Sequence, residues 1–324
     1  MVNMTAQGSP ARVFRMDHAL SNRGGRPERP QGRYALEGHS FEAGKIAPGL
    51  HIVSTPIGNL GDITLRALAT LASADLIACE DTRVTRKLTD RYVIATPLTP
   101  YHDHNAAAAR PKLLQRLAAG AAIALVSDAG TPLLSDPGFK LVRAAQEAGH
   151  AVTVLPGASA SLAALVLAGL PTDEFLFAGF LPAKEAARRA RIQDLAAIPA
   201  TLVLFETAPR IAAALADLAA GLGHREAAVC REITKLHEEV RRGDLASLAQ
   251  SFGETDTRGE IVLVIAPPPD APPADIGDAD PLLRAALTRA SLKDAVSEVA
   301  LATGLPRRAV YRRALELAKE EPAP

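Results

Sequence analysis

The chain has 324 residues, enough for two domains and a small third one. Its 36 Lys and Arg residues balance 36 Asp and Glu residues, so the formal net charge is zero, which argues against a general nucleic-acid binder. Two cysteines exclude a disulfide scaffold and favour a cytoplasmic location, and no uninterrupted apolar run reaches the roughly 18 residues of a membrane span.

The first 48 residues form a basic segment without clear periodicity. They contain six arginines among Gly, Pro and Ser residues. No apolar stretch there has the length of a secretory signal core. Such a composition cannot bury enough apolar surface to fold alone, so we predict a disordered basic tail over residues 1–48.

From residue 50 onward, short apolar runs alternate with helical patterns, which is typical of an α/β protein with a mainly parallel sheet. The predicted strands are residues 50–55, 75–79, 121–127, 151–155, 175–180, 201–205, 227–230 and 260–266. The predicted helices are residues 63–72, 105–119, 137–148, 159–168 and 208–222. Because a Pro-Gly turn interrupts the pattern at 156–157, we predict an N-terminal α/β domain over 49–157 and a second over 158–268.

The last part of the chain differs in composition. Clustered prolines predict a stiff linker over residues 269–280, followed by a helical module over 281–320. Ser291 and Asp294 form a variant of a capping box, and a Thr-Gly-Leu-Pro turn at 303–306 separates two helices. The module therefore resembles a helix-turn-helix.

Three loops rich in Gly, Pro and Ser each follow a predicted strand, at residues 54–62, 127–132 and 156–161. None has the spacing of a dinucleotide-binding or P-loop motif. Small residues let the backbone approach a ligand, and Asp128 offers a carboxylate to an amine or a ribose hydroxyl. Free N–H groups at the helix start near Ser159 suit a polar or anionic ligand. We expect the three loops to converge at one edge of the sheet.

Other polar clusters allow more than one interpretation. Histidines 102 and 104 lack further ligands nearby, so a helix start is favoured over a metal site. Basic residues cluster at 184–191 and at 307–313, where they form either solvated faces or contacts with RNA phosphates. The zero net charge averages these clusters with an acidic stretch at 270–280, so it argues against promiscuous RNA binding only.

These motifs resemble the tetrapyrrole methylase superfamily of S-adenosylmethionine-dependent methyltransferases, and within it the enzymes that methylate a cytidine 2′-hydroxyl in small-subunit (16S) ribosomal RNA. The resemblance runs from residue 50 to about residue 319. It rests on TPIGNL at 55–60, EDTR at 80–83, HDHN at 102–105, SDAGTP at 127–132, GFLPAK at 179–184, REITK at 231–235 and RGE at 258–260. Ser54 and Ala158 stand where the family often has Pro, which affects details of loop shape.

The resemblance implies two α/β domains with the methyl donor in the cleft between them, a small C-terminal helix-turn-helix-like module, a homodimer, no metal and no membrane. The implied cofactor residues are Pro56, Ile57, Gly58, Asp128, Ala129, Gly130, Thr131, Ser159, Ala160 and Phe205. Because a ribose hydroxyl is a weak nucleophile, a base or a cation is needed. The catalytic candidates, each of which could instead form a structural ion pair, are Arg83, Lys184, Glu232 and Lys235.

The implied partner is small-subunit ribosomal RNA, in the assembled subunit. The predicted RNA-binding residues are Arg188, Arg189, Arg191, Arg307, Arg308, Arg312 and Arg313. Two alternatives remain: a tetrapyrrole C-methyltransferase that acts on a porphyrin precursor, and a non-enzymatic nucleic-acid-binding protein. The C-terminal module and the SDAGTP turn argue against the first, and the paired ligand loops argue against the second.

Overall fold

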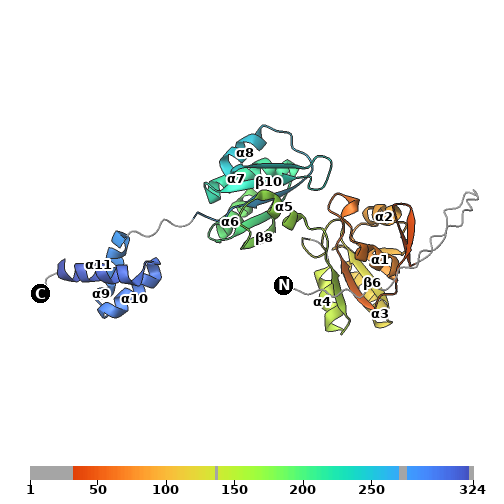
Figure 1. Cartoon of the computed structure of the whole chain (residues 1–324), viewed down its shortest axis with the longest axis horizontal. Helices are drawn as coiled ribbons and strands as arrows, with labels where there is room; N and C mark the ends of the chain where they lie inside the picture. The colour runs from red at the N-terminus through yellow and green to blue at the C-terminus, as the bar shows by residue number, and fades with distance from the viewer. Residues whose placement is uncertain (1–31, 136–137, 270–275, 321–324) are drawn as a thin grey trace, which may run out of the picture. The chain divides into compact units, whose positions relative to one another are not determined.

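The computed structural model describes residues 32–135, 138–269 and 276–320, and it divides into two compact units (Figure 1). The first unit contains Ile63–Asp128 and the flanking segments up to Ser54 and up to Pro156. The second contains everything from Gly157 onward, together with two loops from the N-terminal half, Thr55–Asp62 and Ala129–Asp136. Residues 1–31 of the predicted tail and 270–275 of the predicted linker lie outside the described residues.

Residues 32–48 correct the prediction of a disordered tail. Strands β1 (Arg33–Leu36) and β2 (His39–Glu42) pair in antiparallel register. Tyr34 and Leu36, which alternate along β1, pack against the core of the first unit. Two strands of four residues carry too few apolar positions to show a period in the sequence, so the hairpin depends on this packing.

The first unit contains a five-stranded parallel sheet with the order β5-β4-β6-β3-β7. Its strands are β3 (Gly49–Val53), β4 (Leu76–Cys79), β5 (Leu98–Pro100), β6 (Ala122–Val126) and β7 (Val152–Leu155). Its helices are α1 (Leu65–Ser73), α2 (Thr82–Arg91), α3 (Ala106–Ala118) and α4 (Phe139–Glu147). All predicted elements of this region are present, and β5 and α2 are additional.

The order of the strands explains where this sheet leaves room for a ligand. From β3 the chain moves through β4 to β5, and it then reverses through β6 to β7. Because parallel crossovers are right-handed, α1 and α2 cover one face, and α3 and α4 cover the other. The loops after the neighbouring strands β3 and β6 therefore leave toward opposite faces, which is the switch point where open α/β sheets bind ligands.

The second unit has a five-stranded sheet with the order β11-β10-β12-β9-β8. Its strands are β8 (Phe175–Phe180), β9 (Thr201–Thr207), β10 (Glu226–Arg231), β11 (Glu239–Asp244) and β12 (Glu260–Ile265). Only β8 and β9 are parallel neighbours, and the other three pairs are antiparallel. The expectation of mainly parallel pairing is thus wrong for this sheet. Strand β11 is polar and shows no apolar pattern in the sequence, so the β10–β11 hairpin, which reverses the chain direction before β12, was not predicted.

Helices cover the two faces of the second sheet unequally. On one face lie α6 (Glu185–Ala196), α7 (Ile211–Leu222) and α8 (Leu245–Gly253), whose apolar side chains form one core cluster with alternate strand residues. The other face is packed by α5 (Ala160–Ala168), in a cluster that includes Phe205 and Ile57. Adjacent residues of one strand point to opposite faces, so Phe205, the predicted site residue on β9, can be assigned to the α5 face.

The C-terminal module has its own apolar core. Its helices are α9 (Asp280–Leu287), α10 (Leu292–Thr303) and α11 (Arg307–Glu320). As predicted, the Ser291 hydroxyl accepts the N–H of Asp294, and Gly304 ends α10 with a φ of 69°. The helix pair is therefore present, and α9 packs with it. Among the described residues, no helix is long and apolar enough to cross a membrane.

Candidate active site

The loops that follow β3 and β6 meet within the second unit. Thr55 and Gly130 form a two-way backbone bridge, with N–H to O distances of 2.8 and 3.0 Å. Gly130 has a φ of 73°, and a Cβ added to it would lie 3.3 Å from Cγ2 of Ile57. A substitution here would be strained because side-chain-bearing residues rarely adopt this positive φ, so glycine is favoured at this contact. The structure thus brings together two of the three predicted cofactor loops.

The same region contains the turn that carries two catalytic candidates. A Cβ added to Gly58 would lie 2.5 Å from Cγ of Lys235 and 3.0 Å from the carbonyl oxygen of Ile233. Ile57 also packs with Ile233 in the cluster under α5. Because only glycine allows this approach, the 55–60 motif and the 231–235 motif form one structural unit.

Glu232 and Lys235 form an ion pair within this turn. The Lys235 ammonium lies 2.8 Å from Oε1 of Glu232 and 2.9 Å from Oε2 of Glu260. The backbone N–H of Glu260 also donates to Oε1 of Glu232. Burial raises the pKa of the Glu232 carboxyl, but the hydrogen bonds from Lys235 and Glu260 outweigh it, so the pKa is lowered. Burial lowers the pKa of Lys235, but its two carboxylate partners raise it overall. Both groups are therefore charged at neutral pH.

The start of α5 and the end of β9 lie in the same core cluster as Ile57. Ser159 is the N-cap residue of α5, but its hydroxyl lies 3.0 Å from that of Ser161 and accepts no backbone N–H. The first-turn N–H groups of α5 thus lack a side-chain cap. The ring of Phe205 packs edge-on against Phe177 and Phe180, with ring centroids 4.9 and 5.6 Å apart.

Two further predicted residues lie at the carboxyl edge of the first sheet. Asp128 accepts the backbone N–H of Asp81 at 3.0 Å, and burial raises the pKa of its carboxyl. Asp81 caps α2, and its hydrogen bonds with Arg83 lower its pKa to about 2. The Arg83 guanidinium donates to both oxygens of Asp81, while its side chain is 88% exposed. Asp81 therefore holds an exposed cation in a fixed direction.

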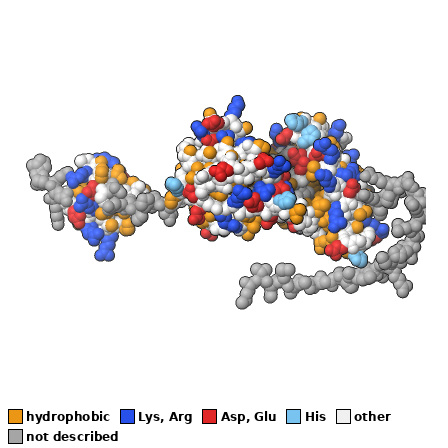
Figure 2. All heavy atoms as spheres, turned by 90° about the horizontal axis from the view of Figure 1, so that it is seen from above, with side chains coloured by type: hydrophobic (Ala, Val, Ile, Leu, Met, Phe, Trp, Pro, Cys, Tyr) orange, Lys and Arg blue, Asp and Glu red, His pale blue; other side chains and the backbone are white. Residues whose placement is uncertain are grey.

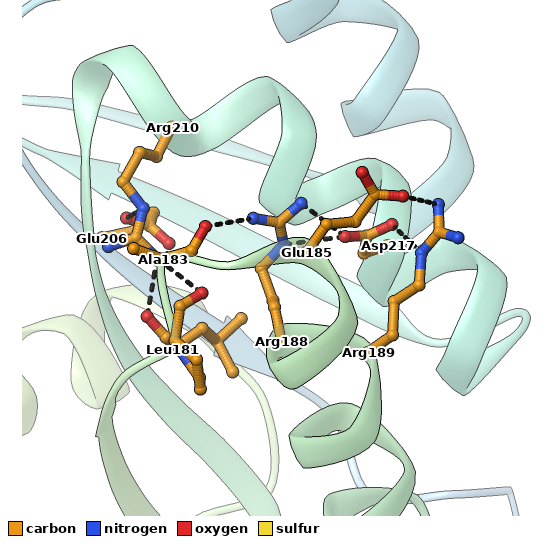
Figure 3. A network of polar contacts seen from close by, with 9 residues as sticks. Leu181, Ala183, Glu185, Arg188, Arg189, Glu206, Arg210 and Asp217 are labelled. Atoms are coloured by element: carbon orange, nitrogen blue, oxygen red, sulfur yellow. Dashed lines mark hydrogen bonds and ion pairs between the residues drawn. The ribbon is translucent and has the colours of Figure 1, made fainter.

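The three predicted RNA-binding arginines of α6 differ in exposure, because Arg189 and Arg191 are exposed and Arg188 is not. Arg188 is buried, with its side chain 9% exposed, and it lies 2.6 Å from Asp217 of α7 (Figure 3). Arg189 also pairs with Asp217 and with Glu185. This burial contradicts the predicted RNA contact of Arg188, because a side chain inside the domain cannot reach a phosphate. Lys184, at the start of α6, is exposed.

The basic cluster on α11 lies mainly on the surface of its module, where Figure 2 shows basic side chains. Arg307, Arg308 and Arg312 are exposed. Arg313 differs, because it pairs with Asp280 of α9 and with Glu316. The pair with Asp280 joins the first and last helices of the module, which gives Arg313 a structural role.

Sequence reasoning missed three charged residues of the second unit. Glu206 and Asp217 are buried acids, and Arg210 donates to backbone carbonyls near Lys184. One signal was available, since Glu206 interrupts an apolar strand directly after Phe205. Among the described residues, no group of three or more His, Cys, Asp or Glu side chains could hold a metal ion.

The fold and the loop cluster define a methyltransferase of the tetrapyrrole methylase class. The family model "Tetrapyrrole (Corrin/Porphyrin) Methylases" matches residues 49–249. A uroporphyrin-III-C-methyltransferase from Thermus thermophilus has 22% identity and a TM-score of 0.50, and it covers 68% of this chain and 94% of that one. A cobalt precorrin-4 methyltransferase has 16% identity and a TM-score of 0.51, and it covers 67% and 94%.

Relatives with higher sequence identity show which family within this class the chain belongs to. A model described as "RsmI C-terminal HTH domain" matches residues 273–318. Two proteins named ribosomal RNA small subunit methyltransferase I, from Mesorhizobium japonicum and Erythrobacter litoralis, are 51% and 52% identical. The matches cover 84% and 86% of this chain, and 93% and 99% of the relatives. The chain belongs to the ribosomal RNA small subunit methyltransferase I family.

Proposed function

We propose that this protein transfers a methyl group from S-adenosylmethionine to the ribose 2′-hydroxyl of a cytidine in small-subunit ribosomal RNA. The observation that carries the proposal is its 51% identity to a relative named for methylation of this RNA, over nearly the whole length of that relative. The uroporphyrin-III-C-methyltransferase and the cobalt precorrin-4 methyltransferase are similar at only 22% and 16% identity, which supports a shared fold and not a shared substrate.

The loops of the second unit fit the chemistry of this cofactor. The uncapped N–H groups at the start of α5 suit its carboxylate. The rings around Phe205 offer an apolar surface to the adenine of the cofactor. The hydroxyl of Thr234 is buried without a hydrogen-bond partner among the described residues, so it is available to a polar group of the cofactor. The residues proposed to hold the cofactor are the ten predicted ones: Pro56, Ile57, Gly58, Asp128, Ala129, Gly130, Thr131, Ser159, Ala160 and Phe205. When bound, S-adenosylmethionine supplies an electrophilic methyl group on a sulfonium.

The charged residues of the chain act on the hydroxyl and on the phosphates. The Lys235 ammonium, held by Glu232 and Glu260, stabilises the negative charge that develops on the attacking oxygen. Glu232 is a weak base because its pKa is lowered, so its role is to orient Lys235. The exposed cations Arg83 and Lys184 contact the RNA.

The C-terminal module gives the protein a second contact with the RNA. Its exposed arginines 307, 308 and 312 bind phosphate, and α6 contributes at most Arg189 and Arg191, since Arg188 is buried. We propose that the substrate is the assembled subunit, that the protein acts as a homodimer, and that a ribosomal substrate places it in the cytoplasm.

The test uses small subunits from cells that lack this protein, incubated with labelled S-adenosylmethionine. We expect label in 2′-O-methylcytidine after nucleoside mass spectrometry, with naked RNA and uroporphyrinogen as parallel substrates. Lys235→Met removes the cation with little change of volume, and we expect it to lower kcat by about a hundredfold. Labelled uroporphyrinogen, or subunits that stay unlabelled, would overturn the proposal.

A further inference from the structure

Three consecutive backbone carbonyls just before Lys184 are held by two arginines (Figure 3). Nη2 of Arg210 donates to the carbonyl oxygens of Leu181 and Pro182, at 2.6 and 3.3 Å. Nη1 of Arg188 donates to that of Ala183 at 3.4 Å. These carbonyls lie between β8 and α6, where no ladder or helix satisfies them. The two guanidinium groups therefore fix the backbone of this connection.

Each arginine pairs with a buried acid, Arg188 with one on another helix and Arg210 with one four residues before it. Asp217 of α7 accepts Nε of Arg188 at 2.7 Å, and its side chain is 6% exposed. Glu206, at the end of β9, has a fully buried side chain, and its Oε1 lies 3.3 Å from Nε of Arg210. Three stretches of the chain thus meet here: residues 181–188, residues 206–210 and the part of α7 around Asp217.

The two ion pairs differ in how completely they are hydrogen-bonded. Asp217 accepts from both Arg188 and Arg189. In the other pair, Oε1 of Glu206 accepts the N–H of Thr207, but Oε2 of Glu206 and Nε of Arg210 have no hydrogen-bond partner among the described residues. A buried pair that is incompletely bonded adds little to stability. Fold stability alone therefore explains the Arg188 pair but not the Glu206–Arg210 pair.

The direction of Glu206 separates it from the cofactor loops. Adjacent residues of β9 point to opposite faces of the sheet. Phe205 belongs to the cluster under α5, together with Ile57, whereas Leu204 and so Glu206 face α6 and α7. Glu206 thus points away from the cofactor loops, and its partner Arg210 is connected to the proposed site through the backbone at residues 181–182.

We propose that Arg210, held by Glu206, is a positioning residue that fixes Lys184 for its contact with the RNA substrate. The inference rests on the proposed function, in which Lys184 contacts RNA. The long Lys184 side chain is exposed, so its placement depends on the backbone from which it extends. Nη2 of Arg210 donates to two of the three carbonyls that precede Lys184, and the planar guanidinium fixes the direction of these N–H groups.

The experiment compares Arg210→Lys, Lys184→Ala and the double variant in single-turnover methylation of small subunits. Arg210→Lys keeps the charge and loses the planar guanidinium, and we expect its rate to fall about tenfold to a hundredfold, with the calorimetric affinity for S-adenosylmethionine within about twofold of wild type. Because Arg210 acts through Lys184, the double variant should be no slower than Lys184→Ala alone. Glu206→Gln, which keeps the shape and removes the charge, should show the same pattern, and it replaces Arg210→Lys if that variant does not fold.

Leu218→Ala provides the matched control. Leu218 is buried in the apolar core that α7 forms with the sheet and has no polar side-chain atom, so its truncation lowers the melting temperature without removing a hydrogen bond from residues 181–183. The rates are compared at a temperature below the melting temperatures of both variants. Equal methylation rates for Arg210→Lys and Leu218→Ala would overturn the inference, and so would additive effects of Arg210→Lys and Lys184→Ala in the double variant. Failure of the proposed function is distinct, because wild-type protein would then leave the subunits unlabelled.

Discussion

Two segments with the same basic appearance, residues 184–191 and 307–313, have different structural roles. On α6, Arg188 and Arg189 turn toward Asp217, which lies 28 or 29 positions further along the chain. On α11, three arginines remain exposed and only Arg313 pairs with a distant acid. Spacing along a helix therefore does not decide whether a cluster of arginines forms a surface. The acids brought near it by the fold decide that.

The largest expected effect is on the stability of the fold, and it concerns the basic cluster on α6 and not the one on α11. Asp217→Ala leaves Arg188 buried without its partner, so we expect the free energy of unfolding to fall by about 3–5 kcal/mol, measured by urea denaturation. Burial raises the pKa of Asp217, but its hydrogen bonds with Arg189 and Arg188 lower it overall. Its contribution is therefore present above the unfolded pKa of about 3.9 and is lost as the pH falls through the lower folded value. Asp217→Asn should remove this part of the acid sensitivity, and an unchanged pH profile would show that the pair is not formed.

The second effect concerns binding and not stability. Replacing arginines 307, 308 and 312 with Glu should lower affinity for small subunits about tenfold to a hundredfold and reduce the salt dependence by roughly two to three phosphate contacts. The three side chains are exposed, so the melting temperature should change little. Filter binding over a salt series measures both quantities. If affinity and salt slope both stay at their wild-type values, the α11 surface does not bind RNA.

A third, smaller effect tests the exception on α11. The side chains of Arg313 and Asp280 are about a quarter exposed, so loss of their pair in Arg313→Ala should cost about 1 kcal/mol. We expect this loss to appear in the melting of the C-terminal module, which Asp280 and Arg313 join across two helices. Arg308→Ala, from the same helix, is the control and should leave the melting unchanged. Equal melting temperatures of the Arg313→Ala and Arg308→Ala variants would show that the pair between Arg313 and Asp280 does not stabilise the module.

The sequence predicted the first unit well because its three central strands, β3, β4 and β6, are buried along their whole length. Each predicted strand there is found within two residues of its position, since a central parallel strand such as β6 is a continuous apolar run. The hairpin of β1 and β2 and the polar strand β11 were missed for the opposite reason. Their residues are mostly part-exposed or exposed, so tertiary pairing and not pattern makes them strands.

The candidate site could be predicted at its loops but not at its supports. Gly58 and Gly130 are recognisable from their motifs, and the structure shows a close contact at Gly58 and a positive φ at Gly130 that favour glycine. The contact between Gly58 and Lys235 joins residues 177 positions apart, and no local pattern encodes such a distance. The same holds for Glu206 and Arg210, whose role depends on carbonyls of another segment. Such supporting contacts form only in the tertiary structure, so they leave no local pattern in the sequence.

The smallest expected effect is the one that tests the α6 cluster most directly. Arg191 is the remaining arginine of that run. Among the described residues its only ion pair is a 3.8 Å contact with Asp194 on the same helix. Both side chains are well exposed, so Arg191→Ala should change the free energy of unfolding by less than about 0.5 kcal/mol. If Arg191 contacts a phosphate, Arg191→Ala lowers affinity for small subunits by a few-fold and reduces the salt slope by about one contact. Asp194→Ala is the matched control, because it breaks the same pair and leaves the cation in place. If both variants bind with wild-type affinity and slope, α6 contributes no phosphate contact at Arg191, and the RNA surface of the protein then depends on the C-terminal module and the exposed cations at positions 83 and 184.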